Sequence, residues 1–206
     1  MTAIKPSSLA TGLTSSDVEI MQQETVYQGY FTLLRYRLRH RQFKGGWSET
    51  FTRELLVRPQ VAAVLPYDPK RRQVVLLEQF RTGALEDERS PWLLELVAGL
   101  VEPGETVEDV VRREAQEEGG LTLLESRPIY QYWSSPGGSS ECVNLFCGRV
   151  DASHAGGIFG LAHEHEDIRS FVVDVDVAFA AVASGLINNA MTIIALQWLQ
   201  LNIDKM

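Results

Sequence analysis

Three glutamates near the end of one predicted helix are the residues of this sequence best suited to chemistry. Glu114, Glu117 and Glu118 fall within a helix expected over 105–118. At 100° per residue they share one side of that helix. Val107 begins the same stripe in the first turn. The stripe therefore changes from apolar to acidic along a face that should point into the protein.

This arrangement is unfavourable for a helix that holds no cation. Glu114 and Glu118 are like charges four residues apart, which destabilises a helix by about 0.2–0.5 kcal/mol. The dipole at a helix C-terminus also disfavours anions, and an unpaired charge on a buried face costs more still. An acidic pair alone usually marks a solvated helix end. The inward stripe instead favours a divalent cation, whose preferred ligands are carboxylate oxygens.

The elements around the glutamates must hold this helix against the protein. Thr106 is a good N-cap, and Asp109 occupies the position of a capping-box acid. The run over 92–100 is almost wholly apolar, which predicts one continuous strand covered on both faces. We therefore expect a buried strand followed by the acidic helix.

Composition limits the classes of function. The 206 residues fit one domain, or one domain with an appendage, and the net charge of −8 argues against a nucleic-acid partner. A bound cation would still let an acidic protein bind phosphate. Residues 1–16 lack a signal-peptide core, and no apolar run could span a membrane. Cys142 and Cys147 are expected to be free thiols, so we predict a cytoplasmic protein without a membrane partner.

The N-terminal quarter has its own pattern. Residues 1–16 are rich in Ser, Thr and Gly and predict a flexible arm, while 18–57 contain aromatic-rich strands with a turn at 43–47. A small antiparallel sheet of this kind is marginal by itself. We expect an N-terminal arm and sheet over 1–57 and the main domain over 58–206.

The main domain mixes strands and helices without regular alternation. That order favours an α/β (α+β) sandwich with a mixed sheet over a doubly wound fold. The expected elements are a hairpin of 61–67 and 73–80, strands over 129–133, 142–150 and 168–175, a loop over 151–167, and helices over 177–183 and 189–201.

Two stretches together match a known 23-residue motif. Gly99 to Glu105, then seven residues, then Arg113 to Leu121 fit the Nudix box, G-x5-E-x7-R-E-U-x-E-E-x-G-U, with Ala115 as the one soft departure. The chain resembles the Nudix hydrolase family in its bacterial ADP-ribose pyrophosphatase branch. Pro136 is the usual marker of that branch, although related sugar-nucleotide hydrolases can share it. Further matching stretches are Glu78–Arg81, Trp92–Gly99, Ser135–Gly138, Glu164–Ile168 and Ile194–Leu199.

The resemblance implies a fold, a cofactor and a set of ligands. The fold would be an α/β/α sandwich, and the cofactor would be Mg²⁺, with Mn²⁺ possible, at two or three ions per site. Arg113 would orient the carboxylates. Glu164 would be the general base and Glu166 a metal ligand, with the reverse assignment of these two left open. The metal ligands would be the carbonyl of Ala98 and the carboxylates of Glu114, Glu117, Glu118 and Glu166.

The resemblance also implies a substrate and an assembly. The reaction would be hydrolysis of ADP-ribose to AMP and ribose 5-phosphate. The N-terminal sheet would be exchanged in a homodimer, so that both chains build each substrate site. The candidate substrate contacts are Arg53, Glu54, Arg81, Ser135, Pro136 and Glu141, with Tyr30 or Phe31 stacking on adenine.

Two alternative functions would require other features in the sequence. A hydrolase of another sugar nucleotide such as GDP-mannose would share the box and differ in the residues around the base, near 27–31 and 134–141. A non-catalytic, metabolite-sensing Nudix module commonly lacks box glutamates and carries a DNA-binding extension. Here all the box glutamates are present and no basic winged-helix segment follows, which favours an enzyme.

Overall fold

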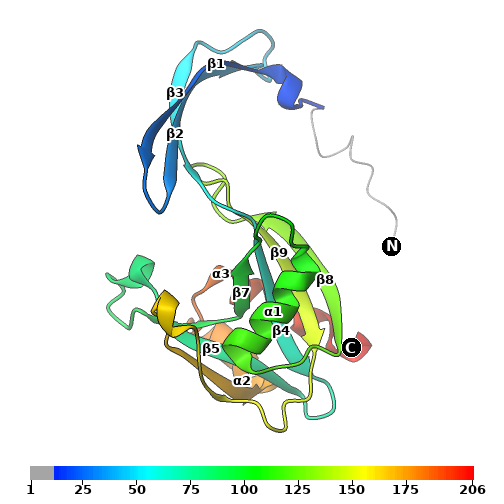
Figure 1. Cartoon of the computed structure of the whole chain (residues 1–206). Helices are drawn as coiled ribbons and strands as arrows, with labels where there is room; N and C mark the ends of the chain where they lie inside the picture. The colour runs from blue at the N-terminus through cyan, green and yellow to red at the C-terminus, as the bar shows by residue number, and fades with distance from the viewer. Residues whose placement is uncertain (1–11) are drawn as a thin grey trace. The chain divides into compact units, whose positions relative to one another are not determined.

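The computed structural model describes residues 12–206, apart from the side chain of Glu164. The chain forms two compact units (Figure 1). One runs to Arg58 and includes Ser135–Glu141, and the other consists of Pro59–Ser134 and Cys142–Met206. The greater part of the expected N-terminal arm, residues 1–11, lies outside the described residues. A 3-10 turn, η2 (Ser15–Asp17), leads into the first strand.

The first unit is built on the small antiparallel sheet that the sequence predicts. Its strands are β1 (Val18–Gln28), β2 (Thr32–His40) and β3 (Phe51–Val57), in the order β1-β2-β3. The loop 135–141 attaches to β3 through Leu56. The amide of Leu56 donates to the carbonyl of Gly138 at 2.9 Å, and its carbonyl accepts from the amide of Ser140 at 3.0 Å.

The second unit contains a mixed sheet, as expected. Its strands are β4 (Val61–Asp68), β5 (Gln73–Phe80), β6 (Trp92–Glu95), β7 (Val97–Leu100), β8 (Glu125–Trp133), β9 (Cys142–Arg149), β10 (Gly157–Phe159) and β11 (Ile168–Asp174). The order is β10-β11-β5-β4-β9-β8, with β6 beside β5 and β7 beside β4. The pair β4 and β9 is parallel and the other pairs are antiparallel.

The prediction of one continuous strand over 92–100 is wrong. The run breaks at Leu96 into β6 and β7, because β4 and β5 pair at only two positions and then separate. Glu95 lies opposite Leu77 of β5, whereas Val97 lies opposite Val64 of β4. A straight strand could not follow both partners, so the chain bends between them.

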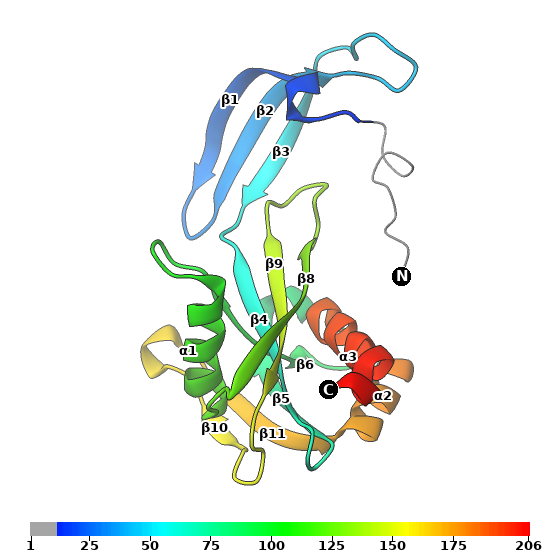
Figure 2. The same cartoon turned by 90° about the vertical axis from the view of Figure 1, so that its right-hand side faces the viewer.

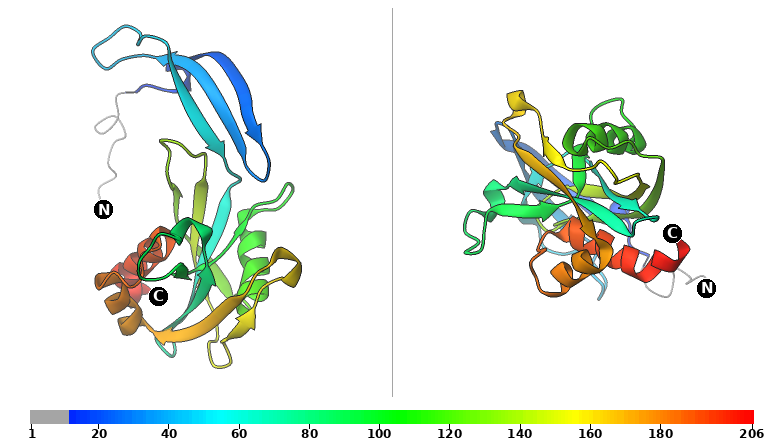
Figure 3. Two further views of the ribbon diagram at one scale, coloured as in Figure 1. Left: turned by 90° about the vertical axis from the view of Figure 1, so that its left-hand side faces the viewer. Right: turned by 90° about the horizontal axis from the view of Figure 1, so that it is seen from below.

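Helices cover both faces of this sheet (Figures 2 and 3). Helix α1 (Val107–Gly119) packs on one face, over a core that includes Val64, Leu77 and Val97. Helices α2 (Val175–Ala183) and α3 (Ala190–Asn202) pack on the other face. The α/β/α sandwich is therefore confirmed. None of the helices in the described part combines the length and hydropathy needed to cross a membrane.

Several predicted boundaries need correction. Helix α1 begins at Val107 rather than Glu105, because Thr106 caps it through a complete capping box with Asp109. Strand β8 begins at Glu125, four residues before the prediction. Its Pro128 is tolerated because β8 is an edge strand with a bulge at that point. Strand β11 ends at Asp174 and α2 begins at once, at Val175.

The predicted loop over 151–167 is not wholly irregular. It contains the short strand β10 and the 3-10 turn η4 (Ala162–Glu164). Strand β10 has only three residues and begins at a glycine, so it gives no alternating pattern in the sequence. It forms because β11 offers an edge for pairing.

Candidate active site

The box glutamates are positioned by the packing of α1 on β7. Glu118 is only 4% exposed, and its Oε2 accepts a hydrogen bond from the backbone amide of Ala98 at 3.0 Å. Glu114 lies over Gly99, where a Cβ atom would overlap with its carboxylate. The acidic end of the stripe therefore rests on the backbone of the strand, as the helical wheel predicts.

Arg113 joins the helix to the loop that precedes it. Its Nη1 donates to Oε1 of Glu114 at 2.7 Å and to Oε2 of Glu117 at 3.0 Å. Its Nε and Nη2 donate to the two carboxylate oxygens of Glu105 at 3.0 and 3.2 Å. These bonds, above all those with Glu105, raise the pKa of Arg113. The guanidinium thus fixes the carboxylates and anchors the loop, which are the two tasks that the box implies.

The electrostatics of this cluster favour a cation. Burial raises the pKa of Glu118 to about 8, the charges of Glu114 and Glu166 add to the rise, and the Ala98 amide and Arg81 oppose it. Burial also raises the pKa of Glu114, against the influence of Arg113. Clustered carboxylates that resist ionisation are stabilised when a positive charge is placed among them.

The donor set suits a hard divalent ion, but its members are engaged with protein groups. Among the residues that the structure describes, no three His, Cys, Asp or Glu side chains form a ready-made metal site. Arg113 binds Glu114 and Glu117, and the Ala98 amide binds Glu118. All the candidate donors are oxygens, which is the ligand chemistry of Mg²⁺. The donor chemistry therefore fits the ion, which would replace Arg113 at Glu114 and Glu117.

Arg81 lies at the end of β5 beside the same cluster. Its Nε and Nη2 donate to Oε2 of Glu95 at 2.9 and 2.7 Å. Burial lowers the pKa of Arg81, but Glu95 and the charges of Glu118 and Glu166 outweigh that effect and raise it. Glu95 is not among the residues predicted for the site. The available signal was a single charged residue inside an apolar run.

The late loop places Glu166 near the glutamates of α1. Oε2 of Glu166 accepts from the amide of Leu161 at 3.2 Å. Gly160 has a φ of +105°, and a Cβ atom there would lie 2.7 Å from Cβ of Glu166. The loop is therefore folded tightly on Glu166. The side chain of the other candidate base, Glu164, lies outside the described residues.

The other candidate substrate residues belong to the first unit. Tyr30 and Phe31 form an edge-to-face pair at the β1–β2 turn, with ring centroids 4.8 Å apart, and Tyr30 is 86% exposed. On the sheet, Glu54 pairs with Arg35 at 2.9 Å, and Arg53 donates to the carbonyl of Thr52 at 2.9 Å. Glu141 pairs with Arg58 at 3.3 Å. The carbonyl of Ser135, next to Pro136, accepts from the amides of Gly138 and Ser139 at 3.2 and 2.9 Å.

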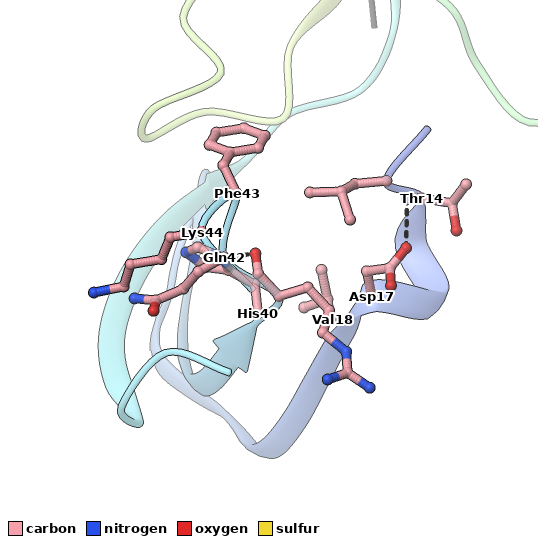
Figure 4. A pocket seen from close by; sticks show the side chains of 9 residues that line it. Thr14, Asp17, Val18, His40, Gln42, Phe43 and Lys44 are labelled. Atoms are coloured by element: carbon pink, nitrogen blue, oxygen red, sulfur yellow. Dashed lines mark hydrogen bonds between the residues drawn. The ribbon is translucent and has the colours of Figure 1, made fainter. Parts of the chain in front are cut away.

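The first unit also contains a hollow of about 500 Å³ beside the end of β2 (Figure 4). Its lining includes Leu13, Val18 and Phe43, and Asp17 is the only carboxylate among the lining residues. The carboxylate of Asp17 accepts from the amide of Thr14 at 2.9 Å and so caps the 3-10 turn. The one lining carboxylate is therefore engaged in the cap, whereas Glu114, Glu117 and Glu118 gather on α1.

Comparison with known proteins identifies the family of the chain. The family pattern described as "NUDIX domain" matches residues 57–188. An "ADP-ribose pyrophosphatase" of Escherichia coli (strain K12) is 49% identical over 97% of this chain and 95% of its own length. A protein of the same name from Haemophilus influenzae is 47% identical over 92% of this chain and 89% of its own length.

More distant likenesses extend the comparison. A "GDP-mannose pyrophosphatase" of Cronobacter sakazakii is 32% identical over 91% of this chain and 97% of its own length. A solved "ADP compounds hydrolase" superposes with a TM-score of 0.66 at 18% identity, covering 89% of this chain and 95% of that chain, and supports the fold alone. On the family match and the high identity to two pyrophosphatases, the chain belongs to the NUDIX family.

Proposed function

We propose that this protein hydrolyses the diphosphate of ADP-ribose to AMP and ribose 5-phosphate, a reaction of nucleotide-sugar metabolism. The observation that carries the proposal is the buried Glu118 beside Glu114 on α1, in a complete Nudix box. The choice of substrate is supported by relatives named ADP-ribose pyrophosphatase, which match at 47–49% identity. The relatives named for GDP-mannose match at 29–32%.

The proposed cofactor is Mg²⁺, with Mn²⁺ as a substitute and two or three ions per site. The carboxylates of Glu114, Glu117, Glu118 and Glu166 and the carbonyl of Ala98 would hold it. When bound, the metal would neutralise the diphosphate and lower the pKa of a coordinated water. Arg113 would then keep its bond to Glu105 and hold the helix in place while the carboxylates turn to the metal.

The chain supplies the remaining chemistry through its own side chains. Arg81 would bind a phosphate oxygen and hold the diphosphate beside α1. Glu164 or Glu166 would take the proton of the attacking water, whose oxygen bonds to one phosphorus atom. The bridging P–O bond breaks, and the phosphate that keeps the bridging oxygen leaves as the second product.

We also propose a homodimer that exchanges its N-terminal sheets and works in the cytoplasm. Apolar and aromatic side chains on this sheet remain exposed in the single chain, including Ile20, Met21 and Tyr27. Tyr30, Phe31, Arg53 and Glu54 of the sheet would then complete a substrate site. Light scattering would report a mass near 23 kDa for a monomer and about twice that for the dimer. The free thiols of Cys142 and Cys147 fit a reducing compartment.

A substrate panel tests the proposed reaction. Purified protein with Mg²⁺ is given ADP-ribose, GDP-mannose and other nucleoside diphosphate sugars in separate reactions, and the products are identified by chromatography. We expect the highest kcat/KM for ADP-ribose, with AMP and ribose 5-phosphate as products. Preferential turnover of GDP-mannose would replace the substrate assignment, and no turnover of any compound would favour a sensing module.

A further inference from the structure

Glu95 is a buried carboxylate outside the Nudix box. It is 3% exposed and ends β6, at the point where β5 and β6 separate from β4 and β7. Side chains alternate along a strand, so Gln79 and Arg81 share the face of Glu95. This face is the one that α1 covers, since Leu77 belongs to the core beneath α1. Glu95 therefore lies inside the unit, on the side of the box carboxylates.

Both oxygens of Glu95 are used. Oε2 accepts from Nε and Nη2 of Arg81 at 2.9 and 2.7 Å and from Nε2 of Gln79 at 3.1 Å. Oε1 accepts from Nδ2 of Asn189 at 2.8 Å. Because Nε and Nη2 of Arg81 both bind Oε2 of Glu95, the edge of the guanidinium that carries these two nitrogens has a fixed orientation. The buried Glu95 therefore fixes the direction in which the guanidinium of Arg81 points.

The other end of Arg81 remains available. Its side chain is 45% exposed, and within the described part of the chain no partner is found for its Nη1. The negative charges of Glu118 and Glu166 raise the pKa of Arg81, so Arg81 lies beside the carboxylate cluster. The guanidinium therefore has one edge bound to Glu95, while Nη1, which has no partner among the described residues, can bind an anion.

Asn189 connects this pair to a rigid element. It is the N-cap of α3, and its Oδ1 accepts from the amide of Thr192 at 3.3 Å. Helix α3 is packed through Ala195, Leu196 and Leu199, which are fully buried. The carboxylate of Glu95 is therefore bound at Oε2 by Arg81 and at Oε1 by the N-cap residue of a buried helix.

Stability alone does not account for this arrangement. A buried ion pair often contributes no more than well-packed apolar residues would, because both charges lose their hydration. We propose that Glu95 is a positioning residue, which holds the guanidinium of Arg81 toward the diphosphate of the substrate. The proposal rests on the proposed function, in which Arg81 binds that diphosphate.

The first test is Glu95→Gln, with Glu78→Gln as the matched control. Gln keeps the size of Glu95 and removes the charge that orients Arg81. Glu78 lies on the neighbouring strand and pairs with Arg169 at 2.7 Å, away from Arg81. Kinetics with ADP-ribose and Mg²⁺ should show about a tenfold lower kcat/KM for E95Q, the scale expected for outer partners of a site. The control should stay within about twofold of wild type, and an unchanged E95Q overturns the proposal.

The division between KM and kcat separates positioning from damage to the fold. Loss of ground-state binding raises KM, whereas a partly unfolded sample lowers the apparent kcat and leaves KM unchanged. We expect the E95Q effect mainly in KM, with circular dichroism and melting showing folded protein. A decrease confined to kcat that parallels a loss of folded protein overturns the proposal.

A double-mutant cycle identifies the residue through which Glu95 acts. If Glu95 acts through Arg81, Glu95→Gln should change kcat/KM by less than about twofold in an Arg81→Ala background. The same tenfold loss in that background overturns the proposal. Should R81A fail to fold, because it leaves Glu95 buried without its partner, Arg81→Lys replaces it in the cycle.

Wild-type turnover is measured before the variants. Wild type that leaves ADP-ribose intact contradicts the proposed substrate. The cycle is then run with the compound of the panel that wild type hydrolyses, and its outcome decides the role of Glu95 separately.

Discussion

The carboxylate of Glu114 occupies the space that a Cβ atom at Gly99 would need. Gly99 belongs to β7 and Glu114 to α1, so this contact sets how closely the helix approaches the strand. The same approach lets Glu118 reach the amide of Ala98. Two glutamates of the box are therefore located by one glycine, and each depends on the distance between helix and strand.

Gly99→Ala should therefore impair activity more than stability. The methyl group would displace the end of a flexible side chain rather than backbone, and an error of about 1 Å in a catalytic group can cost about 100-fold in rate. We expect kcat for ADP-ribose to fall by at least about tenfold while the melting temperature changes little. Gly83→Ala is the control, since a Cβ atom there meets nothing within 4 Å. Equal activity of G99A and wild type would contradict the tight fit.

Glu118→Gln should remove metal-dependent turnover. The amide preserves shape and can still accept from the Ala98 amide, but it is a far poorer metal ligand than a carboxylate. We expect kcat/KM to fall by at least about 100-fold, while metal-free protein melts no lower than wild type because the cost of burying an ionisable carboxyl is removed. The matched variant is Glu108→Gln, at an exposed position of α1. Full Mg²⁺-dependent activity of E118Q would reject the metal site.

Asp68 should make the free energy of unfolding depend on pH in the acid range. It is 1% exposed and accepts from the backbone amides of Lys70, Arg71 and Ala152. Burial would raise the pKa of Asp68, but the bonds from Ala152 and Arg71 outweigh burial and lower it. Its pKa in the unfolded chain is about 3.9. The lowered folded value means that its stabilisation is present above that pH and is lost as the pH falls through the folded pKa.

Asp68→Asn measures this contribution. Urea unfolding at pH 7 should show a loss of about 2 kcal/mol, the scale of hydrogen bonds to a charged group. The difference between the variant and wild type should shrink as the pH falls below about 4. Asp176→Asn serves as the control, because that carboxylate is exposed and lies 3.7 Å from Arg72. A difference independent of pH would exclude ionisation as the cause.

The two cysteines should be inert in the native protein. Both are buried, and burial raises the pKa of Cys147 to about 12. The thiolate is the reactive form, so iodoacetamide at pH 8 should label neither residue at a measurable rate. In urea both should react at the rate of a free thiol. Rapid native labelling located at Cys147 by mass spectrometry would show that its strand opens.

The sequence by itself determined the acidic helix and the Nudix box that it carries. The capping box of Thr106 and Asp109, the apolar stripe and the three glutamates all depend on spacing within one helix, which the helical period fixes. The small antiparallel sheet of the N-terminal unit followed from local strand patterns in the same way. These features need no information about distant parts of the chain.

Only the tertiary structure decided the break at Leu96 and the contacts of Glu95. The break follows from the separation of β4 and β5, and Glu95 meets Arg81 and Asn189 only because three distant segments converge there. In the sequence Glu95 is one charge in an apolar run. Its partners Arg81, Gln79 and Asn189 lie 14, 16 and 94 residues away. Local periodicity carries no information about such pairings, because they depend on which strands and helices pack together.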